Sequence, residues 1–266
     1  MMGTDGQQLL PRLLIESSTY ESSAEYSPDG SRIVFASYRT GNDEIGVCDR
    51  DGSNAVQLTF LEGPRTGTPR WSPDGTSIAF DSTPIGTEGV VYVISATGGR
   101  PRRLTPDSLG ARMPYWMPDG QWLLVDSDAF DSIWKVPLDG GTPVRVTSGV
   151  GRGSRVSPDG TWIYFAKERG IWRQPVAGGE ESVVLDFLGG PGYWGGYAVF
   201  DDGLYFIDNG DLTVKYKDFS SGTINTVVRL SEQGLYMHIS TNRKHILMRN
   251  MASETNMDIA MLENWR

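Results

Sequence analysis

The chain has 266 residues, 38% of them hydrophobic and 21% charged, and a formal net charge of -9 at pH 7. This length is sufficient for a large buried core, and all-β proteins of this size are often a single domain. The excess of acidic over basic residues argues against nucleic-acid binding by this domain, because a nucleic-acid-binding surface needs Lys and Arg to neutralise phosphates.

The sequence contains no candidate membrane segment or signal peptide. No apolar run approaches the roughly 18 residues that span a bilayer. The first six residues, Met1 to Gly6, lack the basic and apolar regions of a signal peptide. We therefore expect a soluble domain that lies in the cytoplasm or the periplasm according to the protein that carries it. The single cysteine, Cys48, excludes an internal disulfide, so the fold must depend on its hydrophobic core.

A four-residue turn motif recurs along the chain at intervals of 40 to 45 residues, with four clear copies and two eroded ones. Pro presets the backbone at the second turn position, and Gly closes the turn. Six units of this length are typical of the four-stranded blades of a β-propeller. The six copies are Ser27-Pro28-Asp29-Gly30, Ser72-Pro73-Asp74-Gly75, Met117-Pro118-Asp119-Gly120, Ser157-Pro158-Asp159-Gly160, Phe200-Asp201-Asp202-Gly203 and Ser240-Thr241-Asn242-Arg243.

Each unit predicts the same order of strands. A short first strand ends in an apolar residue directly before the turn. The second strand is an apolar segment, such as Ile33 to Phe35 or Leu123 to Val125, and we expect the second strands to be the most buried. A third strand, a Gly-bearing hairpin turn such as Asp51-Gly52, and a fourth strand follow.

The two ends of the chain predict how the ring closes. The sixth unit ends with its third strand, Asp258 to Leu262, whereas Pro11 to Ile15 resembles the fourth strand of the second unit, Pro101 to Thr105. The sequence therefore predicts an all-β, six-bladed propeller of four-stranded antiparallel blades, closed by the N-terminal strand, which completes the last blade. The blades of this single domain, 1–266, are predicted at 19–62, 63–107, 108–149, 150–188, 189–231, and 232–266 with 9–18.

The repeat resembles a known family. The pattern Ser-Pro-Asp-Gly-x-x-Ile-x-Phe at 27–35, followed by Gly41 to Ile45, Asp51-Gly52 and Gln57 to Thr59, resembles the TolB-like, WD-type propeller repeat of bacteria. The last nine residues, 258–266, resemble the end of bacterial proteins that fuse a winged-helix domain to such a propeller. This resemblance implies a module of a larger bacterial regulator that serves as a platform for a protein partner or a small molecule. It carries no DNA-binding role to these residues, and fold alone does not fix function.

The first strands of a propeller line its central channel, and the residue that precedes the last apolar residue of each is a candidate for the channel wall. A mixed polar ring at this level could orient a small ligand. Alternatively, the same side chains satisfy one another and, with water, plug the channel. The six residues are Glu25, Arg70, Tyr115, Arg155, Ala198 and His238.

An aromatic segment, Tyr193 to Tyr197, enters the first strand of the fifth unit among glycines. Trp194 could stack on a ring-shaped ligand, or the segment could pack near the channel. The ligand-binding candidates are therefore Glu25, Arg70, Tyr115, Arg155, Trp194 and His238.

Acidic residues are frequent in the loops between second and third strands. They could supply oxygen ligands for a divalent cation such as calcium, or form a solvated acidic rim. No metal-ligating set and no cofactor are predicted from the sequence. The acidic residues are Asp43, Glu44, Glu88, Asp128, Asp131, Glu168, Asp208, Asp211 and Glu254.

Catalytic motifs are missing from the sequence. There is no nucleophile elbow, phosphate-binding Gly-rich loop or His-rich metal signature. A Ser-His-Asp triad would have to use His238 or His245, the only two histidines. We therefore predict a non-enzymatic interaction or small-ligand-sensing propeller without catalytic residues. The alternative is a hydrolase, metal-assisted or not, that acts on small esters, lactones or phosphoesters over the central channel.

Overall fold

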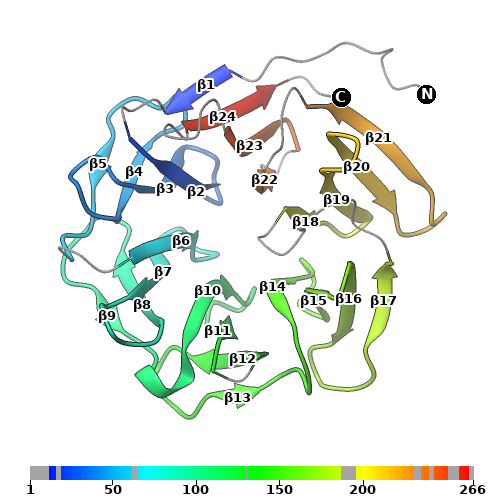
Figure 1. Cartoon of the computed structure of the whole chain (residues 1–266), viewed down its shortest axis with the longest axis horizontal. Coiled ribbons are helices and arrows are strands. Elements are labelled where there is room, and N and C mark those ends of the chain that lie inside the picture. The colour runs from blue at the N-terminus through cyan, green and yellow to red at the C-terminus, as the bar shows by residue number, and fades with distance from the viewer. Residues whose placement is uncertain are drawn as a thin grey trace.

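The computed structural model describes residues 12–15, 19–61, 65–129, 131–186, 196–230, 235–239, 243–250 and 258–263. These residues form six four-stranded antiparallel sheets arranged as blades around a central axis (Figure 1). The predicted six-bladed propeller is therefore confirmed. One short 3-10 helix, η1 (Asp107–Leu109), lies between the second and third blades. No helix among the described residues is long and apolar enough to cross a bilayer.

The first three blades follow one another along the chain, each with its strands in sequence order from the axis outward. Blade 1 contains β2 (Glu21–Tyr26), β3 (Arg32–Ser37), β4 (Glu44–Asp49) and β5 (Val56–Gln57). Blade 2 contains β6 (Arg65–Trp71), β7 (Ser77–Thr83), β8 (Val90–Ser95) and β9 (Arg102–Arg103). Blade 3 contains β10 (Ala111–Trp116), β11 (Trp122–Ser127), β12 (Ser132–Pro137) and β13 (Val144–Arg145).

The last three blades complete the ring, and the sixth combines both ends of the described chain. Blade 4 contains β14 (Arg152–Val156), β15 (Trp162–Lys167), β16 (Gly170–Pro175) and β17 (Ser182–Leu185). Blade 5 contains β18 (Tyr197–Val199), β19 (Gly203–Asp208), β20 (Thr213–Asp218) and β21 (Ile224–Arg229). Blade 6 contains β22 (Leu235–Ile239), β23 (His245–Asn250), β24 (Asp258–Glu263) and β1 (Arg12–Ile15).

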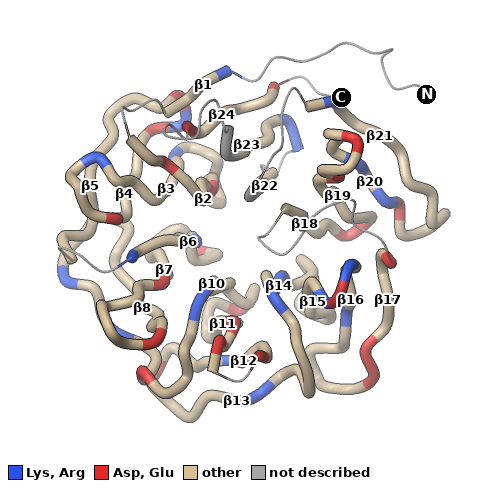
Figure 2. Tube along the Cα trace, in the orientation of Figure 1, with Lys and Arg blue, Asp and Glu red and all other residues tan. Residues whose placement is uncertain are grey.

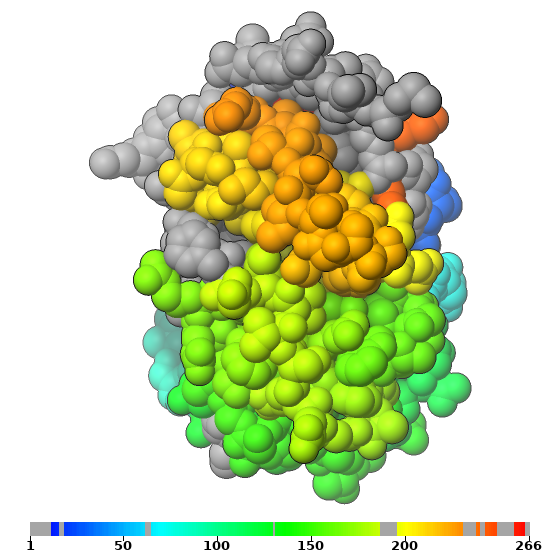
Figure 3. Space-filling model, turned by 90° about the vertical axis from the view of Figure 1, so that its right-hand side faces the viewer, coloured from blue at the N-terminus to red at the C-terminus, as the bar shows by residue number. Residues whose placement is uncertain are grey.

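Basic and acidic residues are spread over the blades and do not gather on one of them (Figure 2). Seen from the side, the fourth and fifth blades pack directly against each other along the outer wall (Figure 3). No single blade therefore carries most of the positive or most of the negative charge.

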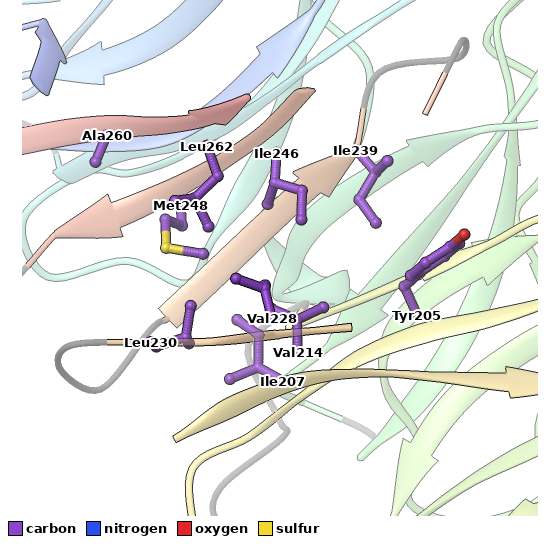
Figure 4. Close-up of a cluster of buried hydrophobic side chains, with 10 residues drawn as sticks. All are labelled: Tyr205, Ile207, Val214, Val228, Leu230, Ile239, Ile246, Met248, Ala260 and Leu262. Carbon is purple, nitrogen blue, oxygen red and sulfur yellow. The ribbon is translucent and has the colours of Figure 1, made fainter. Parts of the chain in front are cut away.

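The hydrophobic core is divided among the contacts between blades. The buried apolar residues of the described chain form six clusters, and each cluster joins two neighbouring blades. In the cluster between blades 5 and 6, Ile207 and Val214 face Ile246 and Met248 (Figure 4). The second strands are buried as predicted, because both of their faces pack against neighbouring sheets. Each blade is thus stabilised mainly by its two neighbours.

A turn geometry that is shared by the first four blades explains the recurring motif. In blade 1, Gly30 adopts φ 71° and donates its N–H to the carbonyl of Ser27. The Asp29 carboxylate accepts hydrogen bonds from the Ser27 hydroxyl and the Ser31 N–H, which lowers the pKa of Asp29 to about 2. In blade 5 the eroded copy forms a shorter hairpin, in which Phe200 and Gly203 exchange backbone hydrogen bonds.

The N-terminal strand closes the ring as predicted. Strand β1 pairs antiparallel with β24, with Arg12 opposite Met261 and Ile15 opposite Ile259. The side chain of Ile15 is 1% exposed and belongs to the cluster between blades 6 and 1, whereas that of Leu13 is 36% exposed. Closure therefore pairs the backbone hydrogen-bonding groups at the edge of β24 and buries apolar surface at the same time.

Replacement of Ile15 by Ala tests this closure. We expect Ile15→Ala to lower the free energy of unfolding by about 2 to 5 kcal/mol, because it leaves a cavity between blades 6 and 1. The control Leu13→Ala, on the same strand but exposed, should change it by roughly 0.5 kcal/mol or less. Denaturant titration measures both values, and equal effects of the two substitutions would contradict the closure.

Candidate functional site

A cavity of about 380 Å³ lies at the centre of the ring and is lined by residues from the first strands of all six blades. Pro158, Asp201 and Arg243, from the turns between first and second strands, border it as well. The predicted channel ring is therefore brought together. All six of its members line the cavity: Glu25, Arg70, Tyr115, Arg155, Ala198 and His238.

In blades 1 to 4, a backbone bulge determines the direction of the side chain that each blade contributes to the channel ring. In each of these blades the register between the first and second strands shifts just before the ring residue. The residue two positions earlier has positive φ: Ser23 (54°), Thr68 (44°), Met113 (51°) or Gly153 (61°). A bulge bends its strand and redirects the side chains that follow, and such strained backbone is common near binding sites.

The residue types at these four positions do not predict the bulges. Ser, Thr and Met have no preference for the left-handed region, and a β-branched residue such as Thr68 is an outlier there. Of the four positions, only Gly153 carries a residue that adopts positive φ without steric cost. Sequence reasoning therefore missed the feature, although the offset of the four positions within the repeat is constant.

Glu25 and His238 form a contact across the closure of the ring. Oε1 of Glu25 lies 3.4 Å from Nε2 of His238, and Oε2 accepts a hydrogen bond of 2.7 Å from the N–H of Trp71. Nδ1 of His238 accepts the N–H of Tyr26 at 3.3 Å, so Nε2 carries the proton. Burial and the nearby Arg70 and Arg155 lower the pKa of His238 to about 3, and the imidazole is neutral.

Arg155 is a buried cation held between two aromatic rings. Its guanidinium carbon lies 5.0 Å from the ring centre of Tyr115 and 5.4 Å from that of Tyr197. Its Nη1 donates to the carbonyl of Ser154 at 2.9 Å, and the hydroxyl of Tyr197 donates to the carbonyl of Gly153 at 2.6 Å. The bulge of blade 4 thus fixes both the arginine and one of its aromatic neighbours.

Asp126 connects blade 3 to this bulge. The side chain is 1% exposed, and Oδ2 accepts a hydrogen bond of 2.6 Å from the N–H of Gly153. Burial raises the pKa of Asp126 to about 7. Asp81, at the equivalent position of blade 2, accepts hydrogen bonds from the hydroxyl of Thr68 and the N–H of Met113. In two blades, therefore, an aspartate accepts a hydrogen bond from the bulge of the next blade.

Two further side chains at the cavity were not among the predicted ligand-binding residues. Tyr197 is the last residue of the aromatic segment, from which only Trp194 was selected as a candidate, and Trp194 itself lies outside the described residues. Arg243 comes from the eroded turn of blade 6 and makes a bidentate ion pair with Asp202 of blade 5, at 2.7 and 2.5 Å. Both residues lie in eroded copies of the turn motif, so the repeat pattern could not predict this ion pair.

Four of the nine acidic loop residues, Asp128, Asp131, Asp208 and Asp211, make ion pairs with basic side chains, and Glu254 lies outside the described residues. Asp128 contacts Arg112 and Arg152, and Asp208 and Asp211 both contact Lys215. Within the described ranges, no three His, Cys, Asp or Glu side chains lie together as a possible metal-binding group. A cation at this rim would have to compete with these ion pairs.

Comparisons with known proteins agree with this architecture. A family model described as the TolB beta propeller domain matches residues 1–186. A TolB homologue of Chlorobaculum tepidum is 35% identical over 125 residues, which are 46% of this chain and 28% of that protein. An uncharacterized peptidase of Bacillus subtilis is 32% identical over 133 residues, which are 46% of this chain and 20% of the peptidase. The chain thus spans less than a third of the length of both relatives.

A solved structure extends the likeness to nearly the whole ring. The gluconolactonase from Xanthomonas campestris superposes with a TM-score of 0.71 over 96% of this chain and 90% of its own, at 14% identity. At this identity the likeness concerns the fold alone.

Asp126 predicts a pH dependence of stability. A carboxyl pKa that is raised in the folded state favours folding at low pH, and this contribution is lost as pH rises toward 7. From pH 5 to pH 8 we expect wild-type protein to lose about 2 kcal/mol of unfolding free energy relative to Asp126→Asn, which cannot ionise. Asp119→Asn, at an exposed turn of the same blade, is the control. Parallel stability curves for wild type and Asp126→Asn would contradict the assignment.

Proposed function

The chain belongs to the TolB β-propeller domain family, and on this premise we propose that it is a non-enzymatic binding module that holds its ligand in the axial cavity. The observation that carries the proposal is the convergence of ring side chains from all six blades on one cavity of about 380 Å³. Pockets for small ligands commonly occupy roughly 300–1,000 Å³ and combine an apolar wall with a few convergent polar groups.

The remaining space supports ligand binding over a plugged channel. Glu25 and His238 contact each other, as the plugged-channel alternative requires. Arg155, however, makes no ion pair with any described residue, although it borders the same cavity. The unused N–H groups of Arg155 are completed either by water, as in the plugged channel, or by a bound ligand, and the size of the cavity favours a ligand.

The hydrolase alternative has less support. Both ring nitrogens of His238 are occupied, one by Tyr26 and the other by Glu25. No hydroxyl or thiol in the described part of the chain is hydrogen-bonded to this imidazole, so a nucleophile activated by it is missing there. The match to the peptidase covers a fifth of that protein, and the likeness to the gluconolactonase concerns the fold.

The wider context of the domain remains part of the proposal. The end of the chain resembles winged-helix fusion proteins, which favours a module of a larger bacterial regulator. In that setting the propeller would bind a small molecule and transmit its presence to the rest of the protein. A protein partner is the second kind of ligand that this resemblance implies.

A thermal-shift screen tests the binding role. We expect small molecules that raise the melting temperature of wild-type protein to lose this effect in Tyr115→Ala, which removes part of the cavity wall. Tyr38→Ala, an exposed tyrosine in a loop of blade 1, should retain every shift. Compounds that stabilise both variants equally would place their site elsewhere and contradict the proposal.

Turnover of small esters and lactones separates the two functions. We expect no activity above the uncatalysed rate, because His238 lacks a nucleophile partner among the described residues. Activity lost in His238→Ala and retained in His245→Ala would instead favour a hydrolase.

A further inference from the structure

We propose that the axial cavity selects small organic molecules that carry a single carboxylate, with the carboxylate bound by Arg155 and the body of the molecule against the aromatic wall. This inference rests on the proposed function of the cavity as a ligand site and specifies its chemistry. It is derived from the contacts of Arg155, the charges around the cavity and the character of its wall.

Arg155 has the geometry of a carboxylate receptor. The side chain is 6% exposed, and Nη1 is held by the backbone carbonyl of Ser154. Nε and Nη2 have no hydrogen-bond partner in the described part of the chain. Because Tyr115 and Tyr197 both lie within cation–π distance of the guanidinium, its orientation is fixed in advance. Two parallel N–H groups on one guanidinium edge match the two oxygens of a carboxylate.

Arg155 makes no ion pair with any described residue, although Glu25 and Asp126 interact with it electrostatically. Burial raises the pKa of Glu25, and Arg70 is the cation that opposes this rise most strongly. Arg155 opposes the rise to a smaller extent, so Glu25 interacts mainly with Arg70. Arg243 is neutralised by its two hydrogen bonds to Asp202, and His238 is uncharged. Arg155 is therefore a cavity cation without a carboxylate in hydrogen-bond contact among the described residues, and the exposed Asp201 is the remaining acid of the lining.

Asp126 is the other acid close enough to influence Arg155. It makes no ion pair with Arg155, and its carboxylate is turned to the N–H of Gly153. Its raised pKa, about 7 through burial, further reduces its negative charge near neutral pH. Asp126 therefore positions the bulge that carries Arg155 and attracts the guanidinium without forming an ion pair with it.

The number of charges favours a monoanion over a dianion. Arg155 offers one guanidinium edge without a hydrogen-bond partner among the described residues, and the carboxylates of Glu25 and Asp201 border the same cavity. A phosphate dianion would bring a second negative charge toward Glu25 without a second free cation, which is unfavourable at low dielectric. A carboxylate satisfies Arg155 with one charge and two acceptor oxygens.

The rest of the cavity wall favours a ligand whose part beyond the carboxylate is uncharged and partly flat. Val199, Phe200 and Ile239 contribute apolar surface, and Tyr115 and Tyr197 contribute aromatic surface. An aromatic or aliphatic acid would bury its body against these residues while its carboxylate meets Arg155.

Isothermal titration calorimetry with matched probes tests the inference. Benzoate and benzamide have the same shape and differ in charge, and inorganic phosphate is the dianionic probe. At low salt and pH 7.5 we expect benzoate to bind wild-type protein at least about tenfold more tightly than benzamide or phosphate, as a charge-assisted hydrogen-bond pair requires. Its affinity should fall as sodium chloride is added.

Variants locate the recognition. Arg155→Gln should weaken benzoate binding at least about tenfold and leave benzamide unchanged, and Arg155→Lys should restore part of the affinity, because it keeps the charge and loses the planar fork. Arg173→Gln, on β16 of the same blade and stacked on Trp162, is the matched control and should bind benzoate as wild type does. If Arg155→Gln does not fold, the wild-type preference for benzoate and its salt dependence decide the question.

The outcomes separate this inference from the function on which it rests. Equal affinity for benzoate and benzamide, tighter binding of phosphate, or full benzoate affinity in Arg155→Gln would overturn the carboxylate assignment. If the same probes lose binding in Tyr115→Ala, the cavity is still a ligand site and the proposed function stands. If no probe binds at millimolar concentration, the carboxylate assignment is wrong, and the thermal-shift screen decides the binding role separately.

Discussion

The antiparallel pairing of β1 with β24 is the contact on which the cavity depends. It joins the two ends of the described chain, and it holds blade 6 against blade 1 through a shared apolar cluster. Tyr26 and His238, which are 212 residues apart in sequence, hydrogen-bond across this junction. The contact between Glu25 and His238 lies there as well. Without closure the six first strands would not face one axis, and their side chains would not enclose one space.

Closure also determines the chemistry of the site. Six first strands converge within a narrow channel, so their polar side chains are buried together whatever their charges. Glu25 contacts His238 and interacts mainly with Arg70, whereas Arg155 lies against aromatic rings and a backbone carbonyl and makes no ion pair with a described residue. A buried guanidinium with unused N–H groups is costly unless water or a ligand completes its hydrogen bonds. The proposed binding function and the proposed preference for a monoanion therefore rest on the same feature, the environment of Arg155.

The sequence predicted the fold because the Ser-Pro-Asp-Gly turn carries its geometry in its residue types, as Gly30 illustrates with its positive φ. It also predicted the ring residues, since their offset from the turn is constant. It could not decide whether the ring was plugged or open, because that depends on distances between blades. The bulges at Ser23, Thr68 and Met113 were missed because these residue types give no sign of positive φ. The pair of Arg243 and Asp202 joins two turns that had lost the motif.

A crystal structure of the protein with bound benzoate is the most direct test of the central claim, that the axial cavity is a binding site built around Arg155. The account predicts benzoate inside the ring, with its carboxylate oxygens facing Nε and Nη2 of Arg155 and its ring against Tyr115 or Tyr197. Benzoate bound outside the ring, or inside it with its carboxylate turned away from Arg155, would contradict the account.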